Sequence, residues 1–183
     1  ELKYAVRRQE ETIYYKRLRM ANPEMSRFKD LILYNLEAGE AVLTDNNDIR
    51  VYTDGKEKFR ALIEEMKQAK RYIHMQYYII RNDELWQEVE KVLIQKAREG
   101  VEVRVLFDSM GCRTMKNRDW ERLEKEGIQV AEFFPALLGQ LQLRVNYRNH
   151  RKIVVIDGRV GFVGGFNVGR EYLGRDKKFG YWR

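Results

Sequence analysis

The sequence predicts a globular α/β fold in which helices pack as layers on a mixed, largely parallel sheet. Helix-type and strand-type segments alternate through residues 56–134, which is the order that βαβ connections produce. The chain has 183 residues, of which 44% are hydrophobic and 34% are charged, so it can bury one ordinary core in water. Its apolar runs are much shorter than the roughly 18 residues that cross a bilayer.

Four segments carry apolar residues at helical spacing. The first covers residues 22–39, with Asn22 as the N-cap, Pro23 at the first helical position and Gly39 just after the end. The other three cover residues 56–70, 83–100 and 117–127.

Strand-type runs rich in β-branched and aromatic residues lie between and after these helices. They cover residues 71–80, 101–109 and 128–134. Residues 41–55 predict two short strands around a polar Asp/Asn turn. Further along, Lys152–Ile156 and Arg159–Val163 predict a hairpin, because Asp157-Gly158 is a dipeptide favoured in two-residue turns.

Candidate chemistry lies in the stretch NHRKIVVIDG, residues 149–158. Side chains alternate between the faces of a strand, so His150 and Lys152 are expected on one face and Ile153 and Val155 on the other. An imidazole beside an ammonium suits a phosphate oxyanion, because histidine attacks or carries a proton and lysine supplies fixed positive charge. Asp157, at the hairpin corner, is a candidate to orient either of them.

Each of these residues also has a structural explanation when it is taken alone. Asp157 is a normal turn residue before glycine, and Lys152 is typical of an edge strand. Asn167 is a normal helix cap after the strand-ending pair Gly164 and Gly165. The functional interpretation therefore depends on their order and spacing as a set.

That set resembles the H-x-K-x-x-x-x-D-G signature of the phospholipase D superfamily, followed by its glycine-rich segment ending in Asn. With YIHMQYYII and VEVRVLFDSMG upstream, the chain from about residue 35 is similar to the first catalytic half of bacterial cardiolipin synthases. The resemblance implies a phospholipase D-like α/β/α sandwich. Residues 39–183 are then a catalytic half-domain with one motif, and residues 1–38 a helical segment or a linker from a membrane anchor.

The resemblance also implies roles for the motif residues. His150 is one of a pair of histidines, and acts either as the nucleophile on phosphorus or as the acid toward the leaving alcohol. Lys152 holds the phosphate oxygens, and Asp157 orients and stabilises a histidine.

Substrate-binding residues follow from the same resemblance. Asn167 donates a further hydrogen bond, with Gly165 in the same glycine-rich segment. Gln76 and Tyr77, on the strand that carries His74, are candidates to reach the same pocket. His74 matches no catalytic position of the signature and is expected to be structural.

The implied reaction forms cardiolipin and glycerol from two phosphatidylglycerol molecules through a phosphohistidine intermediate. It uses no metal or organic cofactor, and two histidines with one cysteine are poor material for a metal site. Family members carry two copies of the signature, whereas this sequence has one. A second histidine is therefore expected from a missing carboxy-terminal half or from a second subunit, and the isolated chain is expected to be nearly inactive.

Charge predicts an anionic partner. The net charge is +7, and the segment Leu141–Arg183 carries the whole excess. The resemblance favours phosphatidylglycerol and an anionic bacterial cell membrane, with the catalytic part at its surface, over nucleic acid. The basic segment Lys3–Arg19 is either an interfacial helix on that membrane or an ordinary linker helix. Two alternatives stay open, a homodimeric nuclease of the superfamily and a non-catalytic module that binds anionic lipid.

Overall fold

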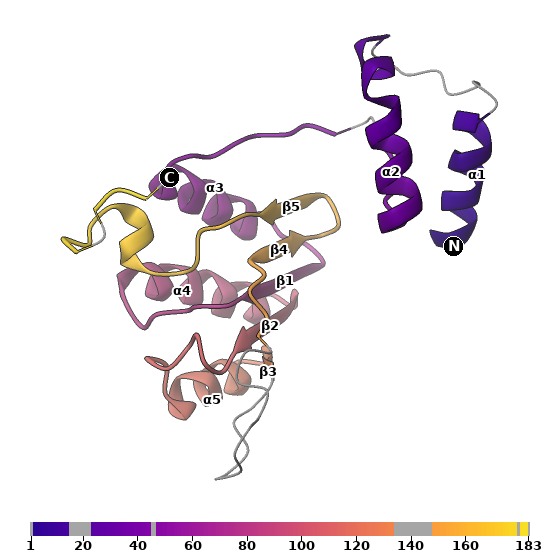
Figure 1. Cartoon of the computed structure of the whole chain (residues 1–183). Coiled ribbons are helices and arrows are strands. Elements are labelled where there is room, and N and C mark those ends of the chain that lie inside the picture. The colour runs from indigo at the N-terminus through magenta and orange to yellow at the C-terminus, as the bar shows by residue number, and fades with distance from the viewer. Residues whose placement is uncertain (1, 15–22, 45–46, 134–147, 179, 183) are drawn as a thin grey trace, which may run out of the picture. The chain divides into compact units, whose positions relative to one another are not determined.

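The chain forms two compact units, Glu1–Val51 and Tyr52–Arg183. The computed structural model describes residues 2–14, 23–44, 47–133, 148–178 and 180–182 (Figure 1). The boundary between the units lies later than the expected division after residue 38. Residues 42 and 43 stay with the first unit because their side chains pack against its small core.

The first unit is a pair of helices with a short 3₁₀ helix before the second one. Its elements are α1 (Leu2–Tyr14), η1 (Pro23–Phe28) and α2 (Lys29–Gly39). The predicted helix over residues 22–39 therefore begins as a 3₁₀ turn, and its predicted cap Asn22 lies outside the described residues. Val6, Ile32 and Leu36 form the buried centre. Among the described residues, no helix combines the length and the apolar character needed to span a bilayer.

The two strands predicted within residues 41–55 are not present in the described part of that segment. The prediction was wrong because alternating apolar residues do not form a strand without a neighbouring strand to pair with. Ile49 and Val51 are 79% and 84% exposed, so neither side chain is packed against another strand.

The second unit contains a five-stranded sheet with the order β3-β2-β1-β4-β5 (Figure 1). Strands β1, β2 and β3 run parallel to one another, whereas β4 is antiparallel to both β1 and β5. The predicted α/β class with a mixed sheet is confirmed, with as many antiparallel as parallel pairings. The strands are β1 (Tyr72–Tyr77), β2 (Glu102–Asp108), β3 (Gln129–Phe133), β4 (Ile153–Ile156) and β5 (Val160–Val163).

Helices α3 (Gly55–Lys67), α4 (Glu84–Arg98) and α5 (Asn117–Lys125) cover one face of this sheet. Successive right-handed crossovers from β1 to β2 and from β2 to β3 put α4 and α5 on the same side, and α3 packs against α4. The core lies between these helices and the sheet. The opposite face of the sheet carries half-exposed and charged side chains such as His74, Glu102 and Arg104, so the described residues supply one helical layer of the predicted sandwich.

The predicted hairpin joins β4 to β5. Asp157 and Gly158 both have positive φ, 57° and 67°, and the Arg159 amide donates to the Ile156 carbonyl at 3.0 Å. This is the backbone geometry expected for Asp-Gly in a tight turn. Ile156 pairs with Val160, so Arg159 belongs to the turn and β5 starts one residue later than predicted.

The Asp157 carboxylate fastens this turn to the beginning of β1. Its two oxygens accept hydrogen bonds from the backbone amides of Lys70, Arg71 and Tyr72 at 2.8, 2.8 and 2.9 Å. Burial alone raises the pKa of the carboxyl, but these three bonds and the nearby Arg159 charge outweigh it and lower the pKa below its ordinary 3.8. Asp157 therefore stabilises the antiparallel pairing of β4 with β1.

We expect Asp157→Ala to lower the free energy of unfolding by about 2 kcal/mol at neutral pH, because three amides lose their acceptor. Asp157→Asn should lose less, since its amide oxygen still accepts and asparagine tolerates the left-handed backbone. A carboxyl with a lowered folded pKa stabilises above its unfolded pKa and stops doing so in acid. Urea unfolding of the three proteins, at neutral pH and at steps below 3.8, should show the difference shrinking; a difference that is constant with pH contradicts this role.

Candidate active site

Three of the predicted site residues, His150, Lys152 and Gln76, lie at the carboxyl ends of the parallel strands, where β4 meets β1. Ligands of open α/β sheets bind at this edge, at the point where connections leave to opposite sides. Tyr78 follows β1, Asp108 ends β2, and His150 and Lys152 lead into β4. Three segments far apart in the sequence thus meet at one edge of the sheet (Figure 1).

His150 and Lys152 lie side by side, as the period-two spacing predicted. Lys152 Nζ is 3.0 Å from His150 Nδ1 and donates to the His150 carbonyl oxygen at 2.6 Å. The lysine is only 5% exposed, whereas the histidine is exposed. The register pairs Gln76 with Ile153 and His74 with Val155, so the apolar residues Ile153 and Val155 face the other side of the sheet.

The short contact between these two side chains fixes the protonation pattern of the imidazole. A charged lysine only donates, so Nδ1 accepts and a neutral His150 carries its proton on Nε2. In this arrangement Nε2 is a hydrogen-bond donor. Attack by Nε2 on phosphorus needs the lone pair of that nitrogen, so Lys152 must first leave Nδ1 or lose its own proton.

Both groups have lowered pKa values. Burial lowers the pKa of His150, the adjacent Lys152 charge lowers it further, and Asp108 opposes this in part. Burial also lowers the pKa of Lys152. The imidazole is therefore neutral at physiological pH, which suits a nucleophile or a base. A bound anion would compensate the charge of the lysine and stabilise its protonated form.

Tyr78 and Asp108 are site residues that the sequence reasoning missed. The Tyr78 ring lies against the His150 ring with centroids 4.5 Å apart and planes at 51°, and Lys152 Nζ lies 5.3 Å from the Tyr78 ring centre. Asp108 is 1% exposed, and its Oδ2 accepts from the amide of Asn149 at 3.0 Å. Both lie near the carboxyl ends of predicted strands, and this position was the available signal.

Gln76 reaches the site indirectly. Its Nε2 donates to Asn149 Oδ1 at 2.6 Å, so Gln76 holds the residue that precedes His150. Tyr77 lies on the other face of β1 from Gln76 and is buried, with its hydroxyl accepting from Lys58 Nζ at 2.6 Å. Of these two residues, Gln76 is thus the one that is linked to the motif, through Asn149.

Asn167 lies beside the site but is engaged with the protein. Its Oδ1 accepts from the amide of Ile79 at 3.1 Å, and its Nδ2 donates to the Tyr172 hydroxyl at 2.7 Å. It is 4% exposed and anchors the segment that follows β1. Gly165 is exposed, and a Cβ built on it meets no atom within 4 Å. Binding of substrate by Asn167 or Gly165 stays a prediction.

Asp157 is not brought to His150. It lies at the opposite end of β4, where its oxygens bind the backbone amides described above. The strand β4, predicted from the sequence, separates the two residues, so the geometry gives Asp157 an architectural position. Orientation of a histidine by Asp157 stays a prediction. His74 lies on the open face, stacked on Tyr72 at 4.5 Å and 2.6 Å from Glu102 Oε1, in agreement with its structural interpretation.

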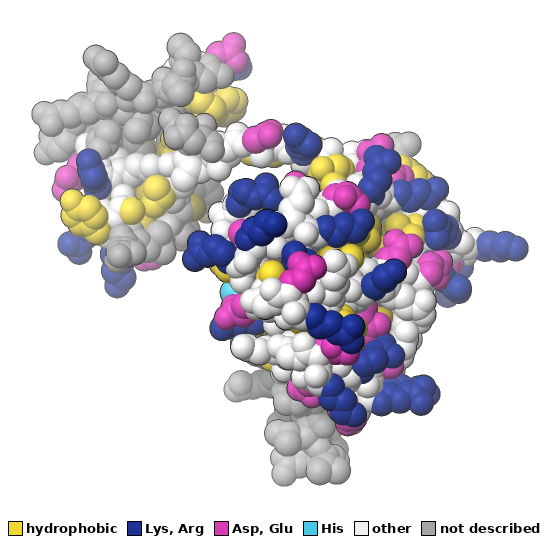
Figure 2. Space-filling model, turned by 180° about the vertical axis from the view of Figure 1, so that it is seen from behind, with side chains coloured by type: hydrophobic (Ala, Val, Ile, Leu, Met, Phe, Trp, Pro, Cys, Tyr) yellow, Lys and Arg dark blue, Asp and Glu magenta, His cyan; other side chains and the backbone are white. Residues whose placement is uncertain are grey.

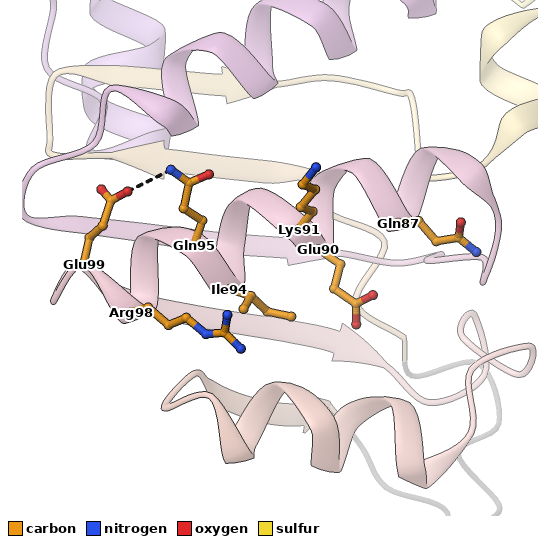
Figure 3. A pocket seen from close by; sticks show the side chains of 7 residues that line it. All are labelled: Gln87, Glu90, Lys91, Ile94, Gln95, Arg98 and Glu99. Atoms are coloured by element: carbon orange, nitrogen blue, oxygen red, sulfur yellow. Dashed lines mark hydrogen bonds between the residues drawn. The ribbon is translucent and has the colours of Figure 1, made fainter.

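A surface hollow of about 520 Å³ lies along α4, away from the motif (Figure 3). Four of its lining side chains, Glu90, Gln95, Arg98 and Glu99, take part in ion pairs or hydrogen bonds. Arg98 pairs with Glu126, Glu90 with Arg122, and Gln95 donates to Glu99. None of the predicted site residues lines it. We therefore locate the candidate chemistry at His150 and not in this hollow.

Charged side chains of both signs are mixed on the face of the molecule that Figure 2 presents, where Lys and Arg side chains are interspersed with Asp and Glu. Within the described residues, no group of three or more His, Cys, Asp or Glu side chains is arranged to hold a metal ion. The absence of a cofactor from the reaction stays a prediction.

The mixed α/β sheet and the H-x-K-x-x-x-x-D spacing at its carboxyl edge are those of the phospholipase D superfamily. Within it, residues 62–178 match the family described as "Cardiolipin synthase, PLD-like domain". The chain belongs to this family, and the resemblance inferred from the motif is confirmed.

Similar proteins include a cardiolipin synthase of Oceanobacillus iheyensis, 50% identical over 161 residues, and the major cardiolipin synthase of Bacillus subtilis, 52% identical over 155 residues. These matches cover 88% and 85% of this chain but 33% and 32% of the relatives. The chain thus spans about a third of their length. Among solved structures, NucT from Helicobacter pylori has a similar fold, with 16% identity, a TM-score of 0.51, and coverage of 67% of this chain and 74% of that chain.

The His150–Lys152 contact predicts a shift in titration. Removing the ammonium with Lys152→Met should raise the pKa of His150 toward its ordinary 6.5, because a neighbouring positive charge disfavours the imidazolium. Titration by NMR is simple, since the chain has only two histidines. Lys91→Met, an exposed position on α4, is the matched control and should leave His150 unchanged. An equal effect of both variants contradicts the contact.

Proposed function

We propose that this chain supplies one half of a phosphatidyltransferase active site, which forms cardiolipin and glycerol from two phosphatidylglycerol molecules. The observation that carries the proposal is the imidazole of His150 held beside the ammonium of Lys152 at the carboxyl edge of the sheet. A neutral nucleophile or proton carrier next to a fixed cation is what transfer of a phosphodiester requires. The family membership and the names of the similar proteins support the same reaction.

The proposed chemistry has two steps. In the first, a histidine nitrogen bonds to phosphorus, the bond from phosphorus to the glycerol oxygen breaks, and a second histidine gives that oxygen its proton. In the second, a hydroxyl of another phosphatidylglycerol bonds to phosphorus, the phosphorus–nitrogen bond breaks, and the second histidine takes the hydroxyl proton. His150 fills one of the two histidine roles, and Lys152 binds the phosphate oxygens throughout.

The second histidine is expected from another part of the protein or from a second subunit. The sequence contains one copy of the signature, and it corresponds to about a third of the length of the similar synthases. We propose that a second motif, on another part of the protein or on a second subunit, meets His150 across the phosphate. The isolated chain is then nearly inactive.

The proposed substrate puts this site at the surface of a bacterial membrane. Phosphatidylglycerol is anionic and resides in the bilayer, so the reacting phosphate lies in the headgroup layer. The positive net charge of +7 favours attraction to such a surface. The basic segment Lys3–Arg19, which includes most of α1 (Leu2–Tyr14), is a candidate contact with the membrane.

A chimera tests the proposal in a protein that contains two motifs. This chain replaces the matching third of the Bacillus subtilis synthase, and the formation of cardiolipin and glycerol is measured on phosphatidylglycerol vesicles. His150→Ala should lower the rate at least about 1000-fold, because it removes a group that bonds to phosphorus or moves its proton. Lys152→Met should lower it by a similar order. His74→Ala, the matched histidine control on the open face, should retain activity.

Several results would count against the proposal. Transfer that survives His150→Ala excludes this histidine from the reaction. A chimera that hydrolyses DNA but does not transfer phosphatidyl groups supports the nuclease alternative. A chimera that binds vesicles and shows no turnover, although the unsubstituted synthase is active, supports the lipid-binding alternative.

A further inference from the structure

We propose that Tyr78 is a positioning residue whose ring face seats both the imidazole of His150 and the ammonium of Lys152. The inference rests on the proposed function, because it concerns the same site. Tyr78 lies outside the H-x-K-x-x-x-x-D signature, and it is brought to the motif by the pairing of β4 with β1.

The ring contacts of Tyr78 account for the arrangement of the pair. The tilted packing on His150, with centroids 4.5 Å apart, falls at the close end of the range that attracts aromatic rings. Lys152 Nζ lies 5.3 Å from the same ring centre, which is within range of a cation–π attraction. The ring of Tyr78 thus holds both groups in position. A carboxylate at the same place would cancel the lysine charge, whereas the ring does not.

The backbone of Tyr78 is fixed by a second segment, the loop after β2. A Cβ built on Gly111 would lie 1.9 Å from the Tyr78 carbonyl oxygen, so only glycine lets this loop approach so closely. The Sγ atom of the next residue, Cys112, lies 3.6 Å from the same carbonyl oxygen. This Sγ also accepts a hydrogen bond from the amide of Ile80 at 3.2 Å. Burial raises the pKa of the Cys112 thiol to about 12, so it stays protonated and able to donate.

A third segment, the one after β5, holds the other side of the Tyr78 backbone. Asn167 Oδ1 accepts from the amide of Ile79, and the Val168 amide donates to the Ile79 carbonyl at 3.1 Å. Arg81 donates from its amide to the Val168 carbonyl at 2.9 Å. Tyr78 therefore lies at a strand end whose backbone is held between two loops, and this fixes the point from which its ring extends toward His150. Asn167 thus supports the site by binding the backbone next to Tyr78, and this role needs no contact with substrate.

The test uses the NMR signals of the two histidines in this chain. Each histidine packs against its own tyrosine, since Tyr72 stacks on His74 at 4.5 Å. We compare Tyr78→Ala, Tyr78→Phe and the matched control Tyr72→Ala. The observables are the ring-current shift of each imidazole proton and the pH titration of each histidine.

Tyr78→Ala should remove the ring-current shift of His150 and raise its pKa, because the imidazole becomes more solvated while Lys152 and Asp108 still face it. Tyr78→Phe should keep the shift, because the contact with His150 is made by the ring of Tyr78 and not by its hydroxyl. Tyr72→Ala should alter only His74, and Tyr78→Ala should leave His74 unchanged, which also reports an intact fold. The proposal is overturned if Tyr78→Ala leaves the His150 shift and titration unchanged, or if Tyr78→Phe changes them as much as Tyr78→Ala.

Kinetics in the chimera then separate this inference from the proposed function. Tyr78→Ala should lower kcat about tenfold with a smaller change in KM, because the ring orients the reacting groups, and Tyr78→Phe should recover most of the loss. An unchanged kcat for Tyr78→Ala overturns the positioning role even where His150→Ala abolishes transfer. Conversely, activity that survives His150→Ala overturns the proposed function, whereas the NMR result on Tyr78 stands by itself.

Discussion

The antiparallel pairing of β4 with β1 is the contact on which the site depends. The register joins Gln76 to Ile153 and His74 to Val155, and it thereby puts His150 and Lys152 at the edge of the sheet beside Tyr78. A slip of one residue would turn every β4 side chain to the opposite face. Polar contacts fix both ends of the pairing. The Asp157 carboxylate binds the start of β1, and Gln76 binds the residue before the histidine.

The residues of the signature divide between chemistry and architecture. The Lys152 ammonium contacts the His150 imidazole at Nδ1 and donates to the His150 carbonyl oxygen, so these two residues bind each other. Asp157 and Asn167 instead accept from backbone amides of the segments on either side of β1. Buried amides at strand ends need such acceptors. The fixed spacing of the signature thus reflects the backbone contacts of Asp157 and Asn167 as much as the positions of the reacting groups.

The electrostatics of Lys152 link this architecture to the proposed reaction. In the part of the chain that the structure describes, the contacts of its ammonium are a carbonyl oxygen, an imidazole nitrogen and an aromatic ring, all of them neutral. A nearly buried cation without a compensating charge is costly. In the proposed reaction, a phosphodiester anion supplies that charge and draws Nζ away from His150 Nδ1. Binding of the anion and release of the imidazole are then one event.

The sequence by itself determined the α/β class, most helices and strands of the second unit, the hairpin turn and the common side of His150 and Lys152. These features follow from periods of 3.6 and 2 residues and from turn chemistry, which act over a few neighbouring positions. Only the tertiary structure decided that residues 41–55 form no described strand, that Asp157 serves the backbone 85 to 87 positions earlier, and that Tyr78 faces the motif. Those outcomes depend on which distant segment pairs with which, and a local pattern of residues does not encode its partner.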